Sequence, residues 1–321
     1  MRLKFLRNVL IVVLFTLAVS HLIHASPPLD ASTVSKAKGA SKVAGSLSDV
    51  SSKASKFTKV LNGGLSTFST YVYGITATMA VIDLIWPGII PTSEPAYVAE
   101  MRAYFEVLKA EFRVVKNQIN DLKLYVQERS TDQIYAGYVI SIHTTELSYQ
   151  DYMDASASLR DAYGKSFVQN YDQLGNHADK LYTGLVIADD NLNIAKNAIS
   201  YTKGDRDRIL EIMFELFNVI NMGIKHEALY YKLTDDTEQI AVLDDRWGSR
   251  MNNLQKVMKA IDDEVVKGAN DRMQTDFNEN VVELKDKDNK KMAQNLYDFF
   301  SEKYYWRGLG GTCLLKVCFR L

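Results

Sequence analysis

His226, Glu227 and Tyr230 are the residues whose types and spacing come nearest to a catalytic site. The stretch "HEALYY", residues 226–231, begins like the helix of a zinc protease, in which two histidines bind the metal and a glutamate is the general base. Tyr230 occupies the position of the second histidine, so this zinc site cannot form. His143 and His177 are scattered, and we expect all three histidines to be surface or hydrogen-bonded polar residues.

Other catalytic and metal-binding motifs are incomplete or missing. The stretch "DKDNKK", residues 286–291, lacks the glycine and the distal glutamate of a calcium-binding loop. No glycine-rich phosphate loop follows a strand pattern, and no nucleophile elbow is present. We therefore expect a protein that is not an enzyme and that needs no cofactor or metal. The formal net charge of −1 provides no basic field, so nucleic acid is not an expected partner.

Asp83 stands alone in a long stretch of the chain that has no other charged residue. It is the only charged residue between Lys59 and Glu94, within "STYVYGITATMAVIDLIWPGIIP", residues 69–91. Three readings are open: a permanent membrane span, the most buried helix of a bundle, or a hairpin that packs in the soluble form and is released into a membrane. An aspartate in mid-segment is costly in lipid, whereas a bundle can give it a polar partner.

The third reading gives this apolar segment a function. It makes residues 66–90 the inserting element, and the charge of Asp83 becomes a restraint that protonation or a buried partner would remove. The residues that would enter the membrane are then Tyr71, Tyr73, Met79, Val81, Ile82, Asp83, Leu84, Ile85 and Trp86.

The N-terminal sequence predicts export. Basic residues precede an apolar run from Val9 to Val19, and Ala25 is followed by two nearby prolines, which is the layout of a signal peptide over residues 1–25. Removing its three basic residues changes the net charge from −1 to −4. Residues 26–60 then form a Ser-, Ala- and Lys-rich amphipathic arm, with six lysines against two aspartates. Such an arm suits either an anionic membrane or a solvated helix face.

The rest of the chain is typical of long helices. No proline follows Pro95, and apolar residues between Met101 and Val126 recur at alternating spacings of four and three, which keeps them on one helix stripe. A narrow stripe also runs from Leu243 to Val265, and residues 209–224 are apolar on more than one face, as in a central helix. These patterns predict an all-α fold: a bundle of long antiparallel helices over residues 61–306, with one mostly apolar helix or hairpin in the core.

The C-terminal part contains an aromatic cluster and both cysteines. The cluster, residues 299–306, suits either a membrane interface or the edge of a core. Glycines begin a tail, residues 307–321, in which Cys313 and Cys318 are candidates for a local disulfide that the main fold would not need.

Two stretches carry a resemblance to known families. "AVIDLIWPGIIP", residues 80–91, leads into the periodic helix and resembles the start of the helical domain of insecticidal crystal toxins. "LFNVINMGIKHEALYYKLTDDTEQIAVLDDRWGSRMNNLQKVMKAI", residues 216–261, is similar to secreted animal proteins of the cephalotoxin and rapunzel type. The resemblance implies an all-α domain of pore-forming type, and it transfers no site residue. The β-rich domains of crystal toxins have no counterpart in this sequence.

The residues and the resemblance together predict a secreted α-helical protein that acts on membranes like a pore-forming toxin. Its partners would be membrane lipid or a cell-surface protein, and it would form a homo-oligomer on the membrane. The alternative is a soluble extracellular helical bundle that binds a protein partner and does not enter membranes.

Overall fold

The protein is all-α, as the sequence predicts. The computed structural model describes residues 35–36, 39–40, 42–43, 52–63, 67–80, 133–156, 158–187, 193–284 and 289–307. Every regular element in these ranges is a helix, and no strand occurs among them.

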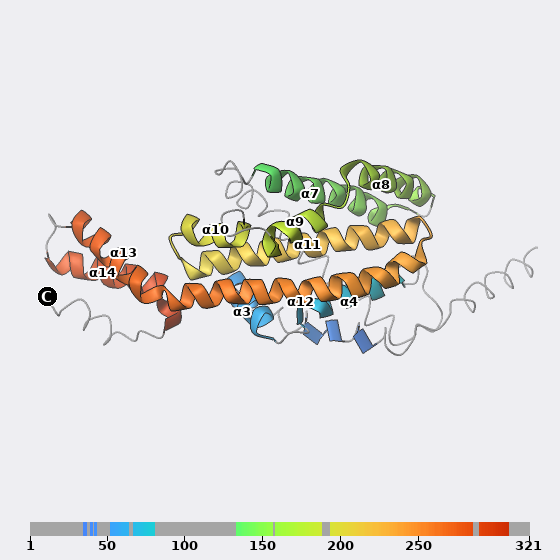
Figure 1. Ribbon diagram of the computed structural model, residues 1–321. Helices are drawn as coiled ribbons and strands as arrows, with labels where there is room; N and C mark the ends of the chain where they lie inside the picture. Colours follow the sequence, from blue (N-terminus) through green and yellow to red (C-terminus); the bar gives the residue numbers. More distant parts are fainter. Residues whose placement is uncertain are drawn as a thin grey trace, which may run out of the picture.

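Two long antiparallel helices form the centre of the molecule (Figure 1). They are α11, Arg206–Leu233, and α12, Thr237–Lys267, and they lie side by side. The side chain of Asp205 caps α11 by accepting hydrogen bonds from the backbone N–H groups of the first turn, and Asp236 caps α12 in the same way. Gly268 ends α12.

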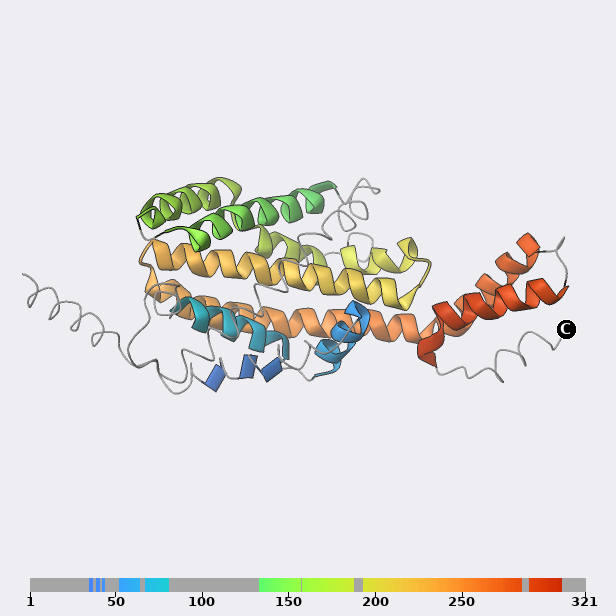
Figure 2. The same cartoon turned by 180° about the vertical axis from the view of Figure 1, so that it is seen from behind.

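Shorter helices cover both sides of this pair. Four of them lie over α11: α7 (Gln133–Asp154) and α8 (Arg160–Leu174) form the upper layer in Figure 1, and α9 (His177–Val186) and α10 (Ile194–Tyr201) lie below them, next to α11. On the other side, α3 (Lys53–Asn62) and α4 (Thr67–Ala80) pack against both α11 and α12, as Figure 2 shows from behind.

The core is built around α11. Nearly every residue of this helix between Ile209 and Leu229 is buried, as expected for a central helix. On α12, the predicted stripe is confirmed, because each of its members is at most 1% exposed: Leu243, Trp247, Met251, Leu254, Met258, Ile261 and Val265.

The spacing of five apolar residues predicts one further helix stripe, but the structure divides it between two helices: Phe167, Tyr171, Leu174, Leu181 and Leu185. Phe167 and Leu181 lie on α8 and α9, which are separated by Gly175 and Asn176. Gly175 has a φ of 73°, a conformation that favours glycine, and the Asn176 side chain caps α9 by accepting a hydrogen bond from the N–H of Asp179. The chain therefore turns back where the periodicity alone continues.

The C-terminal helices form a hairpin beyond the end of α12 (Figure 1). It contains α13, Ala269–Leu284, α14, Asn289–Lys303, and the short 3₁₀ helix η1, Tyr305–Arg307. Its own small core includes Phe300 and Tyr304, whereas Tyr305 is 55% exposed. The aromatic cluster thus forms a core edge.

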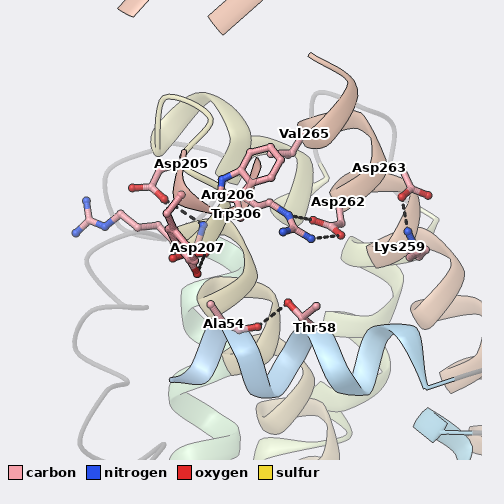
Figure 3. Close-up of polar contacts among 12 residues, drawn as sticks. Ala54, Thr58, Asp205, Arg206, Asp207, Lys259, Asp262, Asp263, Val265 and Trp306 are labelled. Carbon is pink, nitrogen blue, oxygen red and sulfur yellow. Dashed lines mark hydrogen bonds and ion pairs between the residues drawn. The ribbon is translucent and has the colours of Figure 1, made fainter. Parts of the chain in front are cut away.

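An arginine at the start of α11 joins this hairpin to the bundle (Figure 3). The Arg206 guanidinium donates two hydrogen bonds to Asp262, of 2.7 Å from Nε and 2.9 Å from Nη2. The Trp306 ring lies 5.0 Å from the Arg206 Cζ atom, and the Tyr305 hydroxyl donates to Asp207. This paired and stacked geometry is the one for which arginine is suited.

Several predicted segments lie outside the described residues. They are the signal peptide (1–25), most of the arm (26–60), the periodic helix between Met101 and Val126, and the tail from residue 308 with Cys313 and Cys318. Of the arm, α3 crosses the expected border at residue 60, and Phe57 and Val60 are buried in the core of the bundle.

Candidate functional site

The candidate site is the surface on which α4 packs. α4 is the described part of the apolar segment, residues 66–90. We define the α4 seat as four residues of α3, α11 and α12 that contact this helix: Phe57, Phe217, Asp244 and Gly248. α4 contains no charged residue, and Phe68, Val72 and Ile75 are fully buried. Hydroxyl residues on α4 are buried as well, including Thr67, Ser69 and Thr76.

Phe217 of α11 is the apolar centre of the α4 seat. Its ring lies 4.4 Å from that of Phe68 and 5.1 Å, edge to face, from that of Tyr71, measured between centroids. Phe57 of α3 packs against both Phe68 and Phe217. Such aromatic pairs add to the stabilisation from burial, so this cluster fixes how α4 lies on α11.

Asp244 of α12 is the polar centre of the α4 seat. Its Oδ1 atom accepts a 2.8 Å hydrogen bond from the Thr76 hydroxyl, and its Oδ2 atom accepts a 2.7 Å bond from the Lys36 ammonium. The hydrogen bond to Asp244 raises the pKa of Lys36. One carboxylate therefore connects α12, α4 and the basic arm.

Two further contacts strengthen this connection. The Lys36 ammonium lies 4.7 Å from the centre of the Tyr73 ring, a cation–π contact. Tyr73 approaches α12 closely because residue 248 is glycine: a Cβ atom there would lie 2.9 Å from the Tyr73 hydroxyl oxygen. The arm is also held further along the chain, where the Lys53 ammonium of α3 lies 2.9 Å from the Oε1 atom of Glu215 on α11.

A second polar group lies inside the bundle, between α7 and α11. The carboxylate of Glu146 contacts the Lys225 ammonium and the His226 Nε2 atom, each at 2.7 Å, and all three side chains are buried. Burial would raise the pKa of Glu146, but Lys225 and His226 outweigh it and lower this pKa to about 2. Burial lowers the pKa of His226, so its ring is neutral near pH 7 and Nε2 carries the proton that Glu146 accepts.

The next residue of α11, Glu227, is bound to α12 instead. It accepts hydrogen bonds from the indole N–H of Trp247 at 2.9 Å and from the hydroxyl of Tyr231 at 3.1 Å, and it pairs with Arg246. Lys225, His226 and Glu227 thus connect α11 to both of its neighbours. A charged side chain is tolerated inside a protein when it has a polar or oppositely charged partner. We expect these pairs to fix the register of α11 against α7 and α12.

The ionisable side chains of both polar groups have partners inside the bundle. Next to them, Tyr230 stacks on Tyr171 with 4.6 Å between the ring centroids. Within the described ranges, no three or more His, Cys, Asp and Glu residues are placed to hold a metal ion. Among the helices of those ranges, none combines the length and the apolar character that a membrane crossing needs.

The predicted inserting residues are only partly covered by the structure. Tyr71 is buried, Tyr73 is half-buried, and Met79 lies in the last turn of α4. The others lie outside the described residues: Val81, Ile82, Asp83, Leu84, Ile85 and Trp86.

Sequence reasoning missed the polar contacts of the α4 seat. Asp244 is 168 positions from Thr76 and 208 from Lys36, and no local pattern connects them. The buried group on α11 did leave a signal, because Lys225, His226 and Glu227 are three consecutive ionisable residues in an apolar helix.

Comparison with known proteins identifies one matching family. The model of the cephalotoxin-like middle helical domain matches residues 91–287, which is more than half of the chain. This range includes all of α7 to α13, with the buried group on α11 and with Asp244. No curated protein and no solved structure matches the chain.

Proposed function

Since the chain belongs to the family with a cephalotoxin-like middle helical domain, we propose that it is a secreted protein that acts on membranes in the manner of a pore-forming toxin. The inserting element is the apolar segment, residues 66–90, of which α4 is the described part. Residues 1–25 direct export and are then removed, and N-terminal sequencing of the secreted product checks this step, with a first residue at or near Ser26 expected.

The observation that supports membrane action is how α4 is held. The helix carries no charge of its own, so its transfer into lipid exposes no ionised side chain of α4 to hydrocarbon. The charged side chains that hold α4 belong to other parts of the chain. Asp244 of α12 accepts the hydrogen bond from Thr76, and Lys36 of the arm pairs with Asp244. At an anionic membrane, Lys36 and Asp244 can exchange partners. α4 then loses one of the contacts that restrain it, and its own apolar side chains are unchanged.

Dye release from liposomes tests this function. We expect the purified protein without residues 1–25 to release dye, and Asp83→Asn to release more at neutral pH, because the charge that opposes entry into lipid is removed. Acidification should increase release by the wild type more than by Asp83→Asn. Absence of release from both proteins at neutral and acidic pH would contradict membrane action.

The alternative is an extracellular helical bundle that binds a protein partner. It is favoured by the outer face of α7, where Ile140 and Leu147 are 36% and 43% exposed and lie two turns apart on one side of the helix. This function predicts no dye release from liposomes and specific binding to a cell-surface protein. Ile140→Asp would weaken that binding without lowering thermal stability.

A further inference from the structure

A groove separate from the α4 seat lies along α8. Its volume is about 580 Å³, and it is bordered by α8, by Tyr152 near the end of α7, and by Leu233 and Thr234 at the end of α11. A space of this size is within the range of ligand-binding sites. Neither the proposed membrane insertion nor the family match assigns a role to it.

A glycine in the middle of α8 keeps this groove open. Gly164 is buried, and a Cβ atom there would lie 3.4 Å from the Tyr152 ring and 3.6 Å from a Leu233 methyl group. A helix-interior glycine costs about 1 kcal/mol relative to alanine. At this position the missing side chain leaves room above an apolar floor formed by Tyr152, Val168 and Leu233.

The rim of the groove is mainly cationic. Arg160 and Lys165 line it against a single carboxylate, Asp161. Arg160 begins α8, so the partial positive charge of the helix N-terminus adds to that of the guanidinium. Arginine and lysine are the side chains that bind phosphate groups. A cationic rim over an apolar floor fits an anionic group attached to an apolar body.

The surface next to the rim indicates where such an anion comes from. Leu159 and Tyr163 are 50% and 38% exposed. They are four residues apart and therefore share a helix face, adjacent to the face that carries Arg160 and Gly164. An exposed leucine and tyrosine beside cations suit the boundary between lipid headgroups and acyl chains.

We propose that the α8 groove binds the phosphate headgroup of an anionic phospholipid. Arg160 and Lys165 contact the phosphate, the glycerol and upper acyl carbons lie over Tyr152 and Leu233, and Leu159 and Tyr163 rest on the membrane surface. The groove would give the protein a lipid preference, and it does so whether or not α4 inserts.

Flotation with vesicles tests the groove. The protein without residues 1–25 is mixed with vesicles of phosphatidylcholine alone or of phosphatidylcholine and phosphatidic acid in equal parts. We expect binding to the mixed vesicles, and a loss of about tenfold in affinity for Lys165→Ala, as for one charge-assisted hydrogen bond. Gly164→Leu fills the groove without changing any charge and should weaken binding to a similar extent.

Two matched variants serve as controls. Lys256→Ala removes an exposed lysine of α12, and Gly137→Leu adds the same side chain to α7 at a glycine where an added Cβ atom would meet nothing within 4 Å. Both should bind like the wild type. The proposal is overturned if Lys165→Ala binds like Lys256→Ala, or if phosphatidic acid makes no difference to binding.

Inorganic phosphate distinguishes a lipid site from a site for free anions. Competition by phosphate at concentrations comparable to the lipid phosphate would contradict the lipid assignment, whereas binding that resists it supports the role of Leu159 and Tyr163. Dye release is read separately: groove-dependent binding without leakage supports this proposal and contradicts membrane insertion. Leakage that Lys165→Ala and Gly164→Leu leave unchanged supports membrane insertion and contradicts the groove proposal.

Discussion

The Thr76 hydroxyl on α4 donates a 2.8 Å hydrogen bond to Asp244 on α12, and the same carboxylate accepts one from Lys36. Through these two contacts, Asp244 holds both α4 and the basic arm against α12. Removing Asp244 therefore loosens two elements at once, while the aromatic contacts of α4 with Phe217 remain.

Asp244→Ala should increase the mobility of α4 without unfolding the bundle. We expect faster hydrogen exchange in residues 67–80 and a loss of about 1–3 kcal/mol in the free energy of unfolding, because the Thr76 hydroxyl and the Lys36 ammonium lose an acceptor. Asp245→Ala is the matched control, since Asp245 is exposed on the same helix. Equal exchange rates in the two variants would contradict this role of Asp244.

Acid should destabilise the bundle partly through His226. Its pKa in the folded protein lies below the ordinary 6.5, so the unfolded chain binds a proton first as the pH falls. Stability from this group is complete above pH 6.5 and decreases below it, by up to about 1.4 kcal/mol per pH unit. The contribution of Glu146, with a pKa of about 2, is lost only below its ordinary 4.5.

His226→Gln separates these two contributions. Glutamine can still donate a hydrogen bond to Glu146 but does not titrate, so its melting temperature should fall less than that of the wild type between pH 7 and pH 5. Melting curves of both proteins at the two pH values check this. A parallel decrease in the two proteins would show that His226 is not the titrating group.

Two helix glycines should respond in opposite directions to alanine. A Cβ atom at Gly223 of α11 would lie 2.6 Å from the Cβ atom of Ala178 on α9, so Gly223→Ala forces these helices apart. We expect a loss of about 1–3 kcal/mol. Gly137→Ala meets no atom within 4 Å and should stabilise α7 by up to about 1 kcal/mol. Urea unfolding of both variants measures the difference, and a stable Gly223→Ala would contradict the close contact of α9 with α11.

The sequence predicted those parts of the fold that depend on local periodicity. The stripe from Leu243 to Val265 identifies the buried face of α12, because a helix of 31 residues repeats its signal many times. The break at Gly175 was missed, since the apolar spacing continues across it. A glycine followed by an asparagine cap was the available sign of that helix end.

The candidate site was harder to predict because its contacts connect distant parts of the chain. Residues 66–90 were identified by composition, yet their holding residue, Asp244, is one of several aspartates on α12 and has no distinguishing sequence feature. The same applies to Glu146, which lies 79 positions from Lys225. A charged residue in an apolar helix indicates that a partner exists, but only the packing of the helices identifies it.

Membrane action through a released α4 is tested most directly by dye release from liposomes of phosphatidylcholine and phosphatidic acid, with the wild type, Asp244→Ala and Asp245→Ala at equal concentrations. We predict release by the wild type, faster release by Asp244→Ala because α4 leaves its seat more readily, and an unchanged rate for Asp245→Ala. No release by any of the three proteins, or equal rates for Asp244→Ala and the wild type, would contradict this function of α4.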